Sequence, residues 1–80
     1  MRSHRVTLYT KAGCCLCDDA KAALAEARRA VEFDLAEIDI ESDAALYEKH
    51  KHDIPVIEVD GHRAFKHRVA PAQLVERLRR

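Results

Sequence analysis

The sequence shows no excess of charge of either sign and no long hydrophobic run, and each absence excludes a class of function. Its 80 residues include fourteen basic and fourteen acidic side chains, so the formal net charge is zero. Nucleic-acid-binding domains usually carry a basic excess or a basic stripe, so this balance argues against DNA or RNA as a partner. Near the N-terminus only residues 6–9 form an apolar run. That run is too short for a signal-peptide core or a membrane span, which predicts a cytoplasmic protein with no membrane partner.

Other familiar features are also missing. The sequence contains no internal repeat, low-complexity tract, linker, P-loop, dinucleotide-binding fingerprint or catalytic carboxylate pair. The chain is nevertheless rich enough in hydrophobic residues, at 48%, to form a core, which a disordered chain is not. At this length only about 60% of the unfolded surface is buried. We therefore expect one small domain over residues 1–80, acting as a monomer.

All three cysteines fall within residues 14–17. A secreted disulfide-rich scaffold would spread an even number of cysteines along the chain and use them to join distant loops. Clustered cysteines instead indicate thiol chemistry or metal binding in a reducing compartment.

The pattern of apolar residues predicts an α/β fold. We expect strands at residues 6–10, 32–40, 54–59 and 62–65, with Asp60-Gly61 as a two-residue hairpin turn. We expect helices at residues 15–30, from a cap at Ser42 or Asp43 to about His50, and from Pro71 onward. The order β-α-β-α-β-β-α implies a four-stranded mixed sheet flanked by three helices that cover both faces. The first helix should bury one apolar face, formed by Leu16, Ala20, Ala23, Leu24 and Ala27.

Cys14 and Cys17 form a C-x-x-C pair at the start of the first expected helix. This spacing next to a βαβ pattern is typical of a redox motif, because it puts two sulfurs one turn apart on the same side of the helix. The N–H groups and dipole of a helix N-terminus favour a thiolate at Cys14. Lys11 adds positive charge nearby, whereas Asp18 and Asp19 act in the opposite direction. Cys17, further into the helix, is the candidate resolving thiol.

Two alternatives remain for the cysteines at this point. They can simply pack as small buried side chains, or they can supply half of a zinc site, which needs four ligands. The histidines available to complete such a site do not match the spacing of a zinc finger, so we assign no metal ligand. We expect most of the five histidines to lie at the surface: His4, His50, His52, His62 and His67.

Residues 11–17 (KAGCCLC), directly after the first strand, resemble the active-site segment of glutaredoxins, and especially of small bacterial glutaredoxin-like proteins with a Gly-Cys-x-Leu-Cys-Asp motif. Residues 53–56 (DIPV) resemble the cis-proline loop of the same thioredoxin superfamily, and residues 37–40 resemble its second strand. The resemblance covers nearly the whole chain in the right order. It implies a thioredoxin-like fold.

The resemblance also implies a role for individual residues. Cys14 corresponds to the nucleophile of a dithiol oxidoreductase, and Cys17 to the thiol that resolves the mixed disulfide. Pro55 corresponds to the cis-proline, and Ile54 would offer its backbone N–H and C=O to an extended substrate or to glutathione. Lys11 corresponds to a residue that helps hold a glutathione carboxylate.

The two residues between the pair, Cys15 and Leu16, stand where many glutaredoxins have Pro and an aromatic residue. They would also line the substrate or glutathione site. Cys15 either fills an exposed variable position or acts as a second accessible thiol.

The sequence departs from the glutaredoxin pattern at residues 65–71, which contain neither the Gly-Gly pair nor the acidic residue that hold glutathione. The expected substrates are protein or low-molecular-weight disulfides, with no bound cofactor. Glutathione, as a co-substrate, or a thioredoxin-reductase-like partner would supply the electrons. Two other functions stay open: a metal or iron–sulfur binding module, and a redox-inert interaction domain on the same fold.

Overall fold

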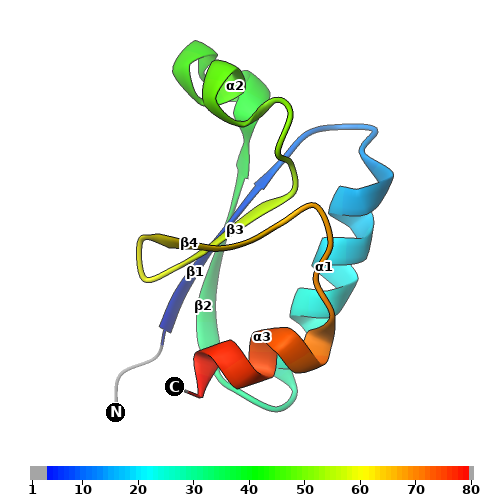
Figure 1. The fold of residues 1–80 in the computed structure, drawn as a ribbon, viewed down its shortest axis with the longest axis vertical. Helices are drawn as coiled ribbons and strands as arrows, with labels where there is room; N and C mark the ends of the chain where they lie inside the picture. The colour runs from blue at the N-terminus through cyan, green and yellow to red at the C-terminus, as the bar shows by residue number, and fades with distance from the viewer. Residues whose placement is uncertain (1–3, 80) are drawn as a thin grey trace.

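The computed structural model describes residues 4–79 and has the expected order of elements (Figure 1). One element was not expected, a short 3₁₀ helix η1 directly after the second strand. The elements are β1 (His4–Thr10), α1 (Cys15–Arg28), β2 (Phe33–Asp39), η1 (Ile40–Ser42), α2 (Ala44–His50), β3 (Val56–Val59), β4 (His62–Lys66) and α3 (Pro71–Leu78).

The four strands form one mixed sheet in the order β2-β1-β3-β4. β1 pairs in parallel with β2, and α1 makes the crossover between them. β1 and β3 are antiparallel, as are β3 and β4. The predicted four-stranded mixed sheet is therefore confirmed.

One face of the sheet carries the hydrophobic core. Helices α1 and α3 lie together on this face (Figure 1), and Val6, Leu8 and Leu24 in its centre are fully buried. Burying each such side chain stabilises the fold by about 1.5–3 kcal/mol. The remaining buried members of the core cluster come from α1, the sheet and α3: Ala20, Ala23, Ala27, Phe33, Ile57, Val59, Leu74 and Leu78.

The other face is covered only at one end, where α2 contacts the sheet through the stacked rings of His50 and Tyr9. The strand register places Arg5 and Asp34 on the same face as Tyr9, and both are exposed. The expectation that helices cover both faces is thus only partly met, because α2 has just seven residues and cannot span the sheet.

The first turn of α1 differs in one respect from the expected apolar face. Cys17 is buried at that end of the helix, whereas Leu16 is half-buried. Leu16 lines the same hollow as Ala20, in keeping with a shared face, but it is only half-buried. The helix begins at Cys15, and Cys17 lies on the side of the helix that faces the core.

Local polar contacts fix the remaining boundaries. Asp43 caps α2, because its carboxylate accepts the N–H of Ala45 at 2.8 Å. Asp60 and Gly61 have φ angles of 53° and 86° and form the expected tight turn between β3 and β4.

Within residues 4–79, no helix has the length and apolar character needed to span a membrane.

Candidate active site

Cys14 ends the loop that leads from β1 into α1 and is the N-cap of the helix. The loop turns at Gly13, where φ is +80°, and the N–H of Cys14 donates to the carbonyl of Lys11 at 3.3 Å. The Sγ of Cys14 accepts a hydrogen bond from the N–H of Cys17 at 3.2 Å. This hydrogen bond fixes the Sγ of Cys14 at the first turn of α1.

Cys17 is the buried member of the pair, with only 1% of its surface exposed. Burial raises the pKa of the Cys17 thiol, and its hydrogen bond with Cys14 acts in the same direction. Hydrogen bonds from Thr10 and from the backbone of Lys11 lower the pKa but do not cancel the increase. Cys14, by contrast, is partly exposed, and all three thiols are free.

The two residues between the pair have different surroundings. Cys15 is exposed. Leu16 is half-buried and lines a hollow of about 330 Å³ between the start of α1 and the segment that enters α3. The other residues around this hollow are Asp19, Ala20, Arg68, Val69, Ala70 and Gln73.

The pairing of β1 with β3 brings the segment before β3 close to the cysteines. Because β1 and β3 are antiparallel with Tyr9 opposite Val56, the chain before Val56 runs beside the chain that leaves β1 toward Cys14. The peptide bond between Ile54 and Pro55 is cis, and Pro55 is buried. The sequence therefore brings its two separate motifs to neighbouring ends of paired strands.

The backbone groups of this segment are already engaged. The N–H of Ile54 donates to the carbonyl of His50 at 3.2 Å, and the carbonyl of Pro55 accepts the N–H of His67 at 2.9 Å. A substrate that pairs with the N–H of Ile54, as the resemblance implies, has to replace the bond to His50.

His67 belongs to the stretch that lacks the Gly-Gly pair. Its φ is +64°, a left-handed conformation that a residue with a side chain rarely adopts. The ring Nε2 of His67 lies 3.0 Å from the carbonyl oxygen of His52. These contacts hold the β4–α3 segment against the Ile54–Pro55 segment without a glycine.

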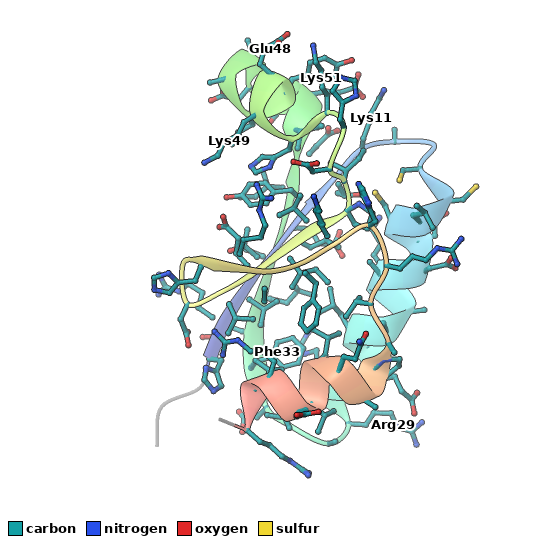
Figure 2. The ribbon with its side chains drawn as sticks, in the orientation of Figure 1. Lys11, Arg29, Phe33, Glu48, Lys49 and Lys51 are labelled. Atoms are coloured by element: carbon teal, nitrogen blue, oxygen red, sulfur yellow. The ribbon has the colours of Figure 1, made fainter. Side chains whose placement is uncertain are left out.

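Lys11 lies on the side of the site that faces α2 (Figure 2), where its Nζ is 5.7 Å from the ring centroid of Tyr47. A cation over an aromatic ring gains about 0.5–1 kcal/mol at an exposed site. The ammonium group is thereby oriented toward α2. Its role in holding a carboxylate stays a prediction.

Sequence reasoning missed three residues near the site. Thr10 hydrogen-bonds the Cys17 thiol, and the hydroxyl of Tyr9 donates to Glu58 at 3.2 Å. His50, one of the five histidines of which most were expected at the surface, is only 1% exposed and stacks on Tyr9. The only available signal for His50 was its place at the end of a short helix, which does not reveal which way its ring points.

The described residues contain no group of three or more His, Cys, Asp or Glu side chains arranged to hold a metal ion. Cys15 and the histidines therefore do not join Cys14 and Cys17 in one cluster.

The fold and the paired cysteines together define a class. A mutant thioredoxin from Halobacterium salinarum superposes with a TM-score of 0.71 over 96% of this chain and 73% of its own, at 13% sequence identity. The fold is therefore thioredoxin-like, with a cysteine pair at the start of its first helix.

Sequence comparison identifies the family within that class. The glutaredoxin-like domain family (DUF836) matches residues 5–79, and the chain belongs to this family. A glutaredoxin-like protein from Dictyostelium discoideum, described as a YDR286C homolog, is 35% identical over 74 residues, which are 85% of this chain and 68% of that protein. The X-ray structure of protein XcR50 from X. campestris has a TM-score of 0.80 at 31% identity, covering 92% of this chain and 95% of its own.

Proposed function

We propose that this chain is a dithiol oxidoreductase that reduces disulfides through Cys14 and Cys17. The observation that carries the proposal is the asymmetry of the pair. Cys14 is partly exposed and its Sγ accepts an N–H at the helix start, whereas Cys17 is buried and its pKa is raised by that burial. An accessible thiolate can attack a substrate, while a buried thiol is protected until the first step has brought a sulfur to it.

The reaction proceeds in two exchanges. The thiolate of Cys14 attacks one sulfur of the substrate disulfide, the substrate S–S bond breaks, and the second substrate sulfur leaves as a thiolate. The Cys17 thiol then loses its proton to that thiolate or to water and attacks the Sγ of Cys14. The mixed disulfide breaks, the substrate sulfur that Cys14 had attacked leaves as a thiolate and takes up a proton, and Cys14 and Cys17 are left as a disulfide.

Two electrons from an external dithiol, or from two monothiol molecules such as glutathione, return the pair to its reduced form. We propose protein or low-molecular-weight disulfides as substrates. The hollow beside Leu16 is the natural place for the group attached to the attacked sulfur, since it adjoins the first turn of α1. Arg68 at its edge supplies a positive charge for a substrate carboxylate.

Serine substitutions at the three cysteines test this assignment, with insulin reduction as the assay. Cys14→Ser should lower turnover by about two orders of magnitude, because no thiolate remains to attack. Cys17→Ser should keep partial activity toward small mixed disulfides. Cys15→Ser is the matched control and should reduce insulin at nearly the rate of the unmodified chain.

Full activity in Cys14→Ser would contradict the proposal. A loss in Cys15→Ser as large as in Cys14→Ser would show that the wrong thiol has been assigned as the nucleophile.

A further inference from the structure

His50, the last residue of α2, is almost completely buried and only partly satisfied. Its ring stacks on Tyr9, with the centroids 4.4 Å apart and the planes inclined by 23°. Within residues 4–79, its Nδ1 is the single buried side-chain nitrogen or oxygen that has no hydrogen-bond partner. Buried polar atoms are nearly always hydrogen-bonded in folded proteins, so this one calls for an explanation.

The backbone of the same residue holds the segment that leads to Pro55. The carbonyl oxygen of His50 accepts the N–H of Asp53 at 2.8 Å and the N–H of Ile54 at 3.2 Å. The ring of His50 thus fixes the end of α2 on the sheet, while its carbonyl fixes the residue before Pro55. A movement of the end of α2 away from the sheet therefore shifts the acceptor of both hydrogen bonds.

Charged groups of both signs surround the ring. Burial lowers the pKa of His50, and Lys49 from the same helix and Arg63 from β4 act in the same direction. Glu58 from β3 and Asp53 from the following loop oppose them. The ring is therefore neutral at pH 7, and protonation favours any conformation in which the ring reaches water. Tyr9 beneath it is neutral too, because burial and Glu58 raise its pKa.

We propose that His50 is a positioning residue: its ring on Tyr9 fixes the end of α2, and its carbonyl, through the bond to Asp53, places the segment that presents Ile54 and Pro55 to an extended substrate. This inference rests on the proposed function, because it assigns the Ile54–Pro55 segment to disulfide substrates. When the ring takes up a proton and leaves Tyr9, the end of α2 is no longer held on the sheet, and the segment that the His50 carbonyl positions loosens. Acid then weakens substrate binding separately from any change in the thiols themselves.

Comparing two reactions of Cys14 isolates this effect. Iodoacetamide alkylates the thiolate without using the Ile54–Pro55 segment, whereas an extended peptide bearing a thionitrobenzoate mixed disulfide needs it. The ratio of kcat/KM for the peptide to the alkylation rate constant should fall about threefold to tenfold as the pH is lowered from 7.5 through the folded pKa of His50, which burial holds below its ordinary value. This is the size of one hydrogen bond's net contribution. The fall should come from KM and not from kcat.

His50→Phe keeps an aromatic ring on Tyr9 but cannot be protonated, so its ratio should stay constant over the same pH range. His52→Gln, which removes an exposed histidine two residues away, is the matched control and should retain the fall. A constant ratio in the unmodified chain, or an equal fall in His50→Phe, would overturn the positioning role.

An NMR titration separates this inference from the proposed function. In the unmodified chain the amide signal of Ile54 should shift with the same midpoint as the ring signals of His50. If the two titrate together but the chain reduces no disulfide, the coupling of His50 to Ile54 stands and the proposed function fails. If the chain reduces disulfides but the Ile54 amide does not follow His50, the positioning role fails alone. This titration needs no variant, so it decides the matter even if His50→Phe does not fold.

Discussion

The two faces of the sheet are built in different ways. On one face, α1 and α3 bury a continuous apolar cluster, and Cys17 is buried at the edge of α1 on that side. On the other face, a single short helix contacts one end of the sheet, and its contact is a histidine ring on a tyrosine ring. The first face therefore holds the apolar core and also buries Cys17, while on the second face His50 joins the end of α2 to the segment before Pro55.

The largest difference between the faces should appear in core truncations. Leu24→Ala removes a fully buried side chain from the first face and should lower the free energy of unfolding by about 2–5 kcal/mol. Ile38→Ala, at a half-buried position on the second face, should cost less than half as much. Urea denaturation followed by circular dichroism measures both. Equal losses would show that the two faces share the stability evenly.

A smaller effect should appear as a pH dependence on the second face. Because the pKa of His50 is lowered in the folded chain, the unfolded chain binds this proton first as the pH falls below about 6.5. Its contribution to stability is therefore complete above that pH and is lost as the pH falls through the folded pKa, by at most about 1.4 kcal/mol per pH unit.

Urea unfolding at several pH values, compared between the unmodified chain and His50→Phe, isolates this contribution. The difference between the two chains should grow in favour of His50→Phe as the solution is acidified. Asp60, whose pKa is lowered by the N–H of Arg5 and by His4, loses its contribution only at lower pH, near and below its ordinary value of 3.8. A difference that does not change with pH would contradict the account of His50.

The smallest effect should come from the start of α2. Asp43→Ala removes the carboxylate that caps this helix and should cost about 1 kcal/mol of stability. Ser42→Ala, next to it, is the matched control and should cost less, because Ser42 donates only to the exposed carbonyl of Asp39. Thermal unfolding measures both, and a larger loss in Ser42→Ala would assign the cap to the wrong residue.

Much of the fold could be predicted from sequence because its signals are local. Alternation of apolar residues predicted the strands. The helix expected at residues 15–30 ends two residues earlier, at Arg28. The turn at Asp60-Gly61 and the cap of α2 depend on the chemistry of one or two residues. The turn was predicted correctly, and Asp43 is the cap of the two candidates, Ser42 and Asp43. The third strand begins at Val56 instead of Ile54, since the pairing of β3 with β1 ends at Val56 and does not include Pro55.

The environment of the site could not be predicted in the same way. Whether Leu16 or Cys17 is buried depends on how α1 rests on the sheet, since both flank the boundary of its apolar face. The burial of His50 depends on a contact with Tyr9, 41 residues earlier in the chain, and a seven-residue helix is too short for its periodicity to indicate which face is covered. Such contacts between distant segments leave no local pattern.

Identifying the disulfide that forms in a redox buffer tests the central claim most directly. The reduced chain is equilibrated in dithiothreitol buffers of graded potential, its free thiols are alkylated, and fragmentation mass spectrometry assigns the remaining pair. The account predicts one intramolecular disulfide between Cys14 and Cys17, with Cys15 alkylated throughout and a midpoint at about −270 to −200 mV. A disulfide that includes Cys15, or no disulfide within that range of potential, would contradict it.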